Sequence, residues 1–107
     1  MIKRYRLNAR GVTFDNRQKD LAKMSGHVFP IWLEREPNNI HDPNAIRIMA
    51  NLGKATCIGY IPAEWAAFFA PTMDNYGATL TADRYVITGG YAGKSYGCIV
   101  DVTHITQ

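Results

Sequence analysis

The chain has 107 residues, of which 47% are hydrophobic, so we expect a single domain over residues 1–107 with a continuous core rather than a disordered tail. No run of 18 or more apolar residues occurs, which excludes a transmembrane helix. The formal net charge is +3, but residues 1–23 hold seven basic and two acidic residues and so carry +5 by themselves. A basic segment suits an anionic polymer such as nucleic acid, and it is equally compatible with a solvated face.

The first half of the chain alternates strand patterns with turn signals. Residues 4–10 place apolar and basic or polar side chains at a period of two, which predicts a half-buried strand with a basic outer face. Residues 17–23 predict a short helix. Residues 27–36 are rich in strand formers, although Pro30 favours an edge position or a bulge. Residues 37–44 are dense in Pro, Asn and Asp and predict a tight, turn-rich loop.

Two further strands are expected over residues 45–49 and 56–61, and a helix should begin at Pro62, where a missing N–H costs nothing. We expect Pro71 to kink or split this helix and Gly77 to end it. Its apolar residues follow at helical spacing and predict one face packed in the core. These residues are Trp65, Phe68, Phe69 and Met73.

The chain should finish with two long strands, about residues 79–88 and 95–105, joined by a glycine-rich hairpin loop. The total is about six strands and two short helices. Short strands in this number favour a small closed or nearly closed barrel, because closure removes exposed sheet edges. The fold class predicted from the sequence is therefore mainly β (α+β), a small six-stranded β-barrel with two short helices.

No arrangement of residues indicates an enzyme. Cys57 and Cys98 lie in separate apolar stretches without zinc-ligand spacing, and we expect two buried free thiols, although a disulfide between them is possible. His41 stands next to Asp42, but adjacent turn residues do not face each other as a catalytic relay requires. We therefore expect no catalytic residue, no metal and no cofactor. A charged N-terminus without an apolar segment after it predicts no signal peptide and a cytoplasmic location.

Four motifs carry more information than folding requires. They are GVTF at residues 11–14, LEREPNNIHDPNAI at 33–46, IGYIP at 58–62 and DNYG at 74–77. In this order, over about residues 10–80, they resemble the HIRAN family. The resemblance implies a modified OB-like barrel, and it implies a function, because helicase-linked members of that family capture the 3′ end of single-stranded DNA.

The resemblance also implies roles for individual residues. Phe14 and His41 take the two positions that stack against the terminal bases, and Asp42 accepts a hydrogen bond from the 3′-hydroxyl. Asn38 and Asn39 reach the base and the backbone, and Tyr60 lies near a phosphate. Stacking one base on an aromatic ring contributes about 1–3 kcal/mol. A carboxylate repels phosphates, so Asp42 fits a nucleic-acid pocket mainly where a free hydroxyl replaces the next phosphate.

The chain departs from the helicase-linked pattern at four positions. Thr13 replaces a basic residue and Ala63 replaces a lysine, so two phosphate contacts are missing. His41 replaces a tyrosine and Tyr60 a histidine. The basic groups available to replace the missing contacts are those of Arg17 and of the outer face of the first strand, namely Arg4, Arg6 and Arg10.

Structural interpretations of the same residues stay open. The side chains of Asn38, Asn39, Asp42 and Asn44 can satisfy the backbone of their own turn. Phe14 can plug one end of a barrel, and Tyr60 suits core and surface equally. Gly59 and Pro62 are expected to be structural.

The leading hypothesis is a binding module, not an enzyme, that recognises single-stranded DNA 3′ ends and has a protein partner such as a helicase or nuclease. One alternative is a protein-interaction adaptor without DNA binding. The other, ranked last, is a hydrolase or nuclease. No membrane partner is expected.

Overall fold

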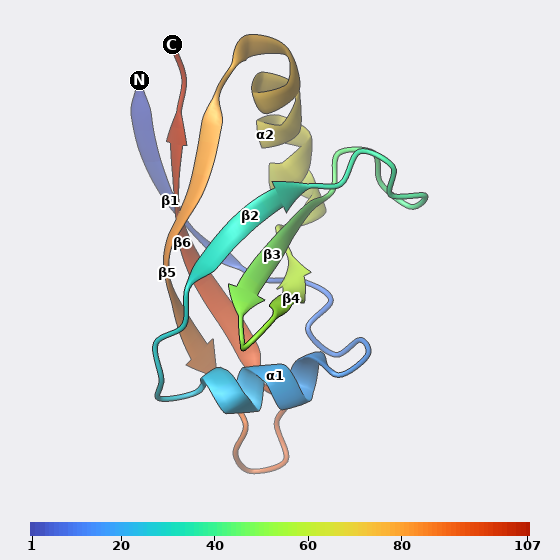
Figure 1. Cartoon of the computed structure of the whole chain (residues 1–107), viewed down its shortest axis with the longest axis vertical. Coiled ribbons are helices and arrows are strands. Elements are labelled where there is room, and N and C mark those ends of the chain that lie inside the picture. Colours follow the sequence, from blue (N-terminus) through green and yellow to red (C-terminus); the bar gives the residue numbers. More distant parts are fainter.

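The computed structural model describes all residues, 1–107, and its longest strands form one antiparallel sheet. The strands β1 (Ile2–Asn8), β6 (Gly97–Ile105) and β5 (Thr79–Thr88) lie in the order β1-β6-β5, and they form the tall sheet on the left of Figure 1. In the central strand β6, Cys98, Val100 and Val102 are buried at alternate positions. Sheet A, as we name this sheet, therefore turns one face to the core and the other to solvent.

Sheet B contains the three shorter strands β2 (Ile31–Arg35), β3 (Ile46–Asn51) and β4 (Ala55–Tyr60), in the order β2-β3-β4. It is antiparallel, with a register shift between Ile48 and Met49. The strand β2 begins directly after Pro30, later than the residue 27 expected from composition. Proline has no N–H to donate to a strand ladder, so pairing starts after it. The loop of residues 37–44 joins β2 to β3 and projects from the molecule on the right of Figure 1.

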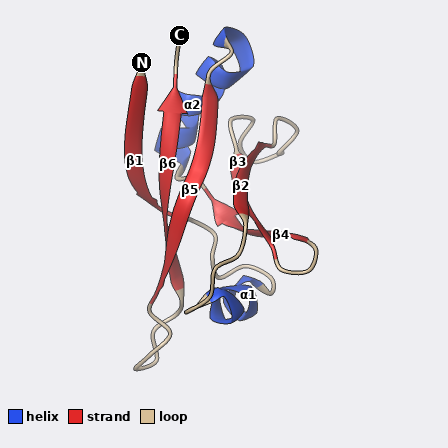
Figure 2. Cartoon of the chain, turned by 60° about the vertical axis from the view of Figure 1, so that its left-hand side comes forward, coloured by secondary structure: helices blue, strands red, loops and turns tan.

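The six strands and two helices are confirmed, but the expected closed barrel is not found. The strands form two separate three-stranded sheets, which Figure 2 shows side by side. At one seam a single bridge joins Arg10 to Tyr60, with N–H···O distances of 2.8 and 2.9 Å. At the other seam the Tyr85 hydroxyl accepts from the Phe29 N–H at 3.0 Å and donates to the His27 carbonyl at 2.7 Å. At this seam the Tyr85 side chain makes the hydrogen bonds that a backbone strand ladder would have to make if the two sheets closed into a barrel.

Two helices close the open sides of the sheets. The helix α1 (Arg17–Met24) confirms the short helix predicted over residues 17–23, and it buries Leu21 and Met24. The helix α2 (Ala63–Tyr76) runs unbroken through Pro71, so of the two effects expected of Pro71, a kink or a split, the split does not occur. Pro71 is exposed on the helix surface, where the carbonyl that loses its partner can face water. Gly77 ends the helix in the left-handed conformation with φ +68°, as predicted.

One core fills the space between the two sheets and the helices, and it combines side chains from β1, β3, β4, β5, β6 and both helices. Phe69 is fully buried, whereas Trp65 is half-buried and Phe68 is 50% exposed. The prediction that Phe68 belongs to the core is therefore wrong, because its side chain lies at the margin of the apolar face of α2. Both cysteines are free thiols, but only Cys98 is buried and Cys57 is half-buried. No helix has the length and apolar character needed to cross a membrane.

Candidate nucleic-acid interface

The projecting loop of residues 37–44 is held by its own side chains. The Asn39 amide oxygen accepts from the N–H groups of His41 and Asp42, at 2.9 and 3.0 Å, and the Asn39 amide nitrogen donates to Glu36. The Asp42 Oδ1 atom accepts from the Asn44 N–H at 2.9 Å, whereas its Oδ2 atom has no partner in the chain. The loop thus fixes the Asp42 carboxylate and leaves one of its oxygens free to accept a hydrogen bond.

Arg35, at the end of β2, fastens this loop to the body of the protein. Its guanidinium donates to the Ala45 carbonyl at 2.7 Å and to the Pro43 carbonyl at 3.0 Å. It also forms two hydrogen bonds to the Asp74 carboxylate in the last turns of α2, at 3.0 and 2.8 Å. Hydrogen bonding from Arg35 lowers the pKa of Asp74. One side chain therefore joins the two ends of the loop that carries Asp42 to the helix.

Tyr60 and Glu36 form the wall beneath the loop. The Tyr60 hydroxyl donates to Glu36 Oε1 at 2.8 Å, the same oxygen that Asn39 binds. The Asn39 hydrogen bond is the main cause of a lowered pKa at Glu36, and burial is the main cause of a raised pKa at Tyr60. The Arg17 guanidinium lies over the Tyr60 ring, 5.4 Å from its centroid. The Tyr60 hydroxyl is thus occupied by a carboxylate, and Arg17 supplies the positive charge next to it.

Gly59 and Gly11 permit the close approach that brings the first strand to this wall. A Cβ on Gly59 would lie 2.9 Å from the Arg10 carbonyl oxygen, and this confirms that Gly59 is structural. A Cβ on Gly11, at φ +69°, would lie 3.7 Å from the Phe14 ring and 3.9 Å from the Tyr60 ring. Gly11 therefore lies close to both the Phe14 ring and the Tyr60 ring, and its positive φ suits glycine.

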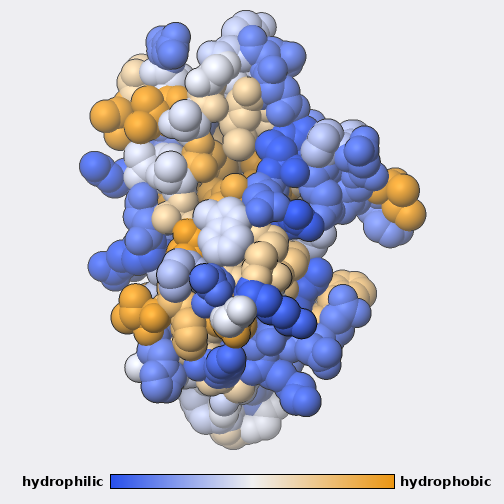
Figure 3. All heavy atoms as spheres, in the orientation of Figure 1, coloured by the Kyte–Doolittle hydropathy of each residue, from blue (hydrophilic) through white to orange (hydrophobic).

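These elements enclose a cleft of about 340 Å³. Four of the residues predicted for the site line it, namely Asn39, His41, Asp42 and Tyr60. Its other lining residues are Arg10, Ala45, Ile61 and Ala63. His41 is exposed and Asp42 half-buried, so the cleft opens to solvent beside the projecting loop, whose tip carries an apolar spot in Figure 3. The sequence thus named four of the eight lining residues, but not the bonds that already occupy Asn39 and Tyr60.

The other predicted site residues lie outside the cleft. The Phe14 side chain is 66% exposed, which excludes a role as a plug of the core. Arg17 is half-buried beside it and donates to the Gly11 carbonyl at 2.7 Å. Thr13 and Asn38 are exposed and do not line the cleft.

Arg10 was expected from the sequence only as one of several basic groups on the first strand, and the structure places it at the cleft. It borders the same cleft as Ala63, the position where a lysine was expected, so a basic group is present there after all. Arg10 is 3.7 Å from Glu64, and both side chains are about two-thirds exposed, so this ion pair is weak and open to exchange. The signal in the sequence was the basic alternation that runs from Arg4 to Arg10.

The site contains no metal-binding arrangement. No group of three or more His, Cys, Asp or Glu side chains is placed to hold a metal ion anywhere in the chain. Asp42 is the one acidic residue that lines the cleft, and Arg10 is its one arginine or lysine. Such a pair can bind a hydroxyl and a neighbouring anionic group, respectively.

Comparison with known proteins agrees with the fold and the motifs. The family model described as HIRAN domain matches residues 3–95. A crystal structure of a protein from Lactobacillus plantarum, determined by a structural genomics consortium, has 21% sequence identity and a TM-score of 0.64, with 100% of each chain covered. At this identity the similarity concerns the fold alone. No curated protein matches the chain.

Proposed function

The chain belongs to the HIRAN domain family, a family of nucleic-acid-binding modules, and from this premise we propose that its cleft captures the 3′ end of single-stranded DNA. The observation that carries the proposal is the Oδ2 atom of Asp42, which has no hydrogen-bond partner and lies in an open cleft. The Asp42 carboxylate is held in place there because its Oδ1 atom accepts from the Asn44 N–H. A terminal 3′-hydroxyl can donate to this oxygen, whereas an internal or terminal phosphate would be repelled by it.

The surroundings of Asp42 support contacts to the last nucleotides. The exposed rings of Phe14 and His41 offer surfaces on which bases can stack. Arg10 and Arg17 offer guanidinium groups for phosphates, in place of the two basic residues missing at Thr13 and Ala63. Asn39 acts by holding the loop, because its amide is already bonded on both sides.

We further propose that the protein acts by binding and not by catalysis. In this proposal it works in the cytoplasm and delivers a partner, such as a helicase or nuclease, to DNA ends. The chemistry of the cleft supports a binding role. It offers one fixed acceptor at Asp42, one guanidinium group at Arg10 and the exposed ring of His41, with no nucleophile beside a general base.

The experiment is a titration of labelled short single strands that end in a 3′-hydroxyl or in a 3′-phosphate, followed by fluorescence anisotropy at low and moderate salt. We expect clear preference for the hydroxyl end. Asp42→Asn keeps an acceptor for the Asn44 N–H but can replace the free oxygen by an amide donor, so binding of the hydroxyl end should weaken by about 1.5–3 kcal/mol. Binding of the phosphate end should not weaken.

Two further variants sharpen the result. Phe14→Ala should weaken both ligands by at least ~1 kcal/mol. Asp15→Asn is the matched control, because Asp15 is exposed outside the cleft and asparagine tolerates its left-handed φ of 52°. Equal affinity for the two ends in the unmodified protein would refute end recognition. Absence of binding even at low salt would favour the adaptor alternative.

A further inference from the structure

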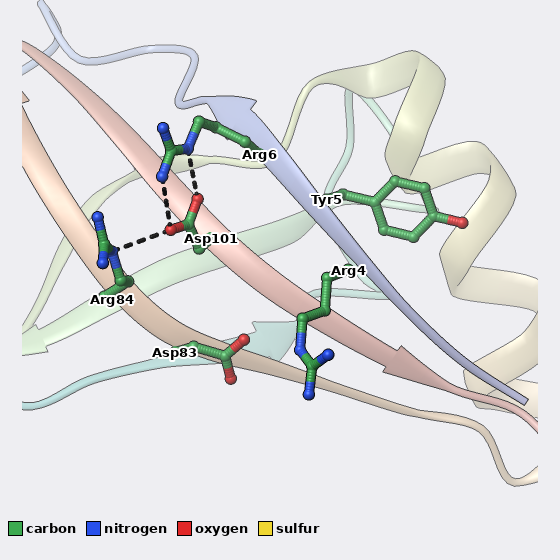
Figure 4. A pocket seen from close by; sticks show the side chains of 6 residues that line it. All are labelled: Arg4, Tyr5, Arg6, Asp83, Arg84 and Asp101. Carbon is green, nitrogen blue, oxygen red and sulfur yellow. Dashed lines mark hydrogen bonds and ion pairs between the residues drawn. The ribbon is translucent and has the colours of Figure 1, made fainter.

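The outer face of sheet A carries a second cleft, of about 410 Å³, that the end-binding proposal does not use. Three arginines from two strands surround it, Arg4 and Arg6 on β1 and Arg84 on β5 (Figure 4). Asp101 on the central strand β6 lies between them, because it is paired in register with both Arg6 and Arg84. The cleft also includes Asp83, so its basic groups outnumber its acidic ones by three to two.

Asp101 orients two of the guanidinium groups. Arg6 donates to it through Nε at 2.8 Å and Nη2 at 3.1 Å, and Arg84 Nε lies 3.0 Å from the second carboxylate oxygen. The Nη1 atom of Arg6 and both terminal nitrogens of Arg84 keep their donors free. Arg6 and Arg84 are 63% and 65% exposed, respectively. The pair is therefore held in place with unused donors that face solvent.

The third arginine has no partner within the chain. Arg4 forms no ion pair and no side-chain hydrogen bond, and Figure 4 shows it on the same side of the sheet as Arg6 and Arg84, while Tyr5 points to the other side. The nearby Asp83 is engaged by the hydroxyls of Thr81 and Thr103. An arginine without a partner beside two oriented ones is an arrangement suited to binding phosphate groups.

We propose that this outer cleft of sheet A binds the phosphate backbone of the same nucleic-acid strand whose 3′ end lies at Asp42. The inference rests on the proposed function, and it adds a second, separate contact surface. The strand β1 connects the two clefts, because Arg4 and Arg6 border one of them and Arg10, which follows β1, borders the other. A strand bound at its end therefore needs only to follow β1 to reach the second cleft.

The spacing along β1 fits a nucleic-acid backbone. Residues two apart in a strand are separated by roughly 6.6 Å, a spacing close to that of consecutive phosphates along one nucleic-acid strand, which are joined by one sugar-phosphate unit. Arg10 lies four residues after Arg6 and beyond the end of β1, so the Cα atoms of Arg10 and Arg6 are at most roughly 14 Å apart, a distance that a few nucleotides can span.

A recess next to the outer cleft can receive a base. Asp83 and Arg84 also border this recess of about 260 Å³, whose wall includes His27 and Phe29. The rings of His27 and Phe29 lie 6.4 Å apart at an angle of 57°. Basic groups that follow a backbone, with aromatic rings beside them, are the usual combination in sites for single-stranded nucleic acid. This combination favours a nucleic-acid strand over an acidic protein partner.

The test compares a 4-nucleotide with a 16-nucleotide oligothymidine, both ending in a 3′-hydroxyl, and measures the dependence of the binding constant on salt. The test variant is Arg4→Gln/Arg84→Gln, and both positions are exposed, so the fold should survive. The matched control is Lys54→Gln/Lys94→Gln, which removes the same charge from exposed loops outside both clefts. Melting temperatures of all variants verify the fold.

For the 16-mer, the slope of log K against log salt should become shallower by about 1.4 in the arginine variant, or about 0.7 for each lost phosphate contact. The 4-mer should bind the arginine variant as it binds the unmodified protein. The lysine control should leave the difference between the two lengths unchanged.

Three results would overturn the inference. The first is an unchanged salt slope for the 16-mer in the arginine variant, and the second is an equal loss of affinity for the 4-mer and the 16-mer. The third comes from polyglutamate as a second probe: if the arginine variant loses binding to polyglutamate but binds the 16-mer unchanged, the face binds an acidic protein. Failure of end recognition is distinguished by the 3′-phosphate comparison, because that comparison depends on Asp42 and not on the arginines of sheet A.

Discussion

The Arg35 side chain is the contact on which the position of the Asp42 loop depends most, and Arg35→Met tests it. Methionine keeps an apolar stem of similar length and removes all four hydrogen bonds, two to Asp74 and two to the carbonyls of Ala45 and Pro43. The Arg35 side chain is only 15% exposed, so water cannot fully replace these bonds.

The expected loss of stability follows from the environment of each partner. The Asp74 side chain is 43% exposed, so water hydrates it after the change and the ion pair itself contributes about 1 kcal/mol or less. The Ala45 carbonyl still accepts from the Glu36 N–H at 2.9 Å, so it is not left without a partner. Arg35→Met also removes the charge-assisted hydrogen bonds to the carbonyls of Ala45 and Pro43. Together with the ion pair, this should lower the free energy of unfolding by about 2–3 kcal/mol. For a domain of this size that corresponds to a fall of roughly 10–20 °C in Tm.

Urea unfolding and thermal melts followed by circular dichroism measure this loss, and the DNA titration measures its effect on the site. Affinity for a 3′-hydroxyl end should fall as well, because the loop that holds Asp42 loses its attachment to α2. Arg84→Met is the control for the stability measurement alone, since Arg84 is 65% exposed and pairs only with Asp101, but it borders the outer cleft of sheet A proposed to bind phosphates. If Arg35→Met costs no more stability than Arg84→Met, Arg35 does not hold the loop and the reasoning is refuted.

Three further predictions concern the rest of the fold. Gly59→Ala should lower the free energy of unfolding by roughly 1–3 kcal/mol, because the new Cβ would meet the Arg10 carbonyl oxygen at 2.9 Å, and unchanged urea unfolding would contradict this. Burial raises the pKa of the Cys98 thiol to about 11, so an alkylating reagent at pH 8 should modify the native protein once, at the half-buried Cys57, and two additions by intact mass would be the contrary result. Hydrogen bonding from Arg35 lowers the pKa of Asp74 below 3.8, so its contribution to stability is complete above that pH and is lost as pH falls toward the folded value. Asp74→Asn should remove part of the acid dependence in urea unfolding, and an unchanged dependence would argue against the ion pair.

Local patterns predicted the elements well because each depends on near neighbours. The alternation around Leu7 defined β1, and the Gly77 position defined the end of α2. Closure of the sheets depends instead on which edges meet in space. The Tyr85 hydroxyl forms hydrogen bonds with the backbone of His27 and Phe29 at the edge where the two sheets meet. The periodicity of the sequence gives no sign of these bonds. The prediction of a barrel was wrong for that reason.

The same division applies to the site. The motifs named four of the eight residues that line the cleft, among them Asp42 and His41. They could not predict how side chains share partners, so the sequence did not reveal that Glu36 accepts from both Asn39 and Tyr60. Nor could they place Arg10 at the cleft, because the bridge between Arg10 and Tyr60 joins segments fifty residues apart.

The most direct test of end capture at Asp42 is an NMR titration of the labelled protein with a tetranucleotide that carries a free 3′-hydroxyl. We predict that the backbone amide shifts concentrate at Asp42, Asn44, Tyr60 and Ala63, and that the shifts of Asp42 and Asn44 disappear when the same strand ends in a 3′-phosphate. Shifts that are the same for both ends, or that avoid these residues altogether, would contradict the account.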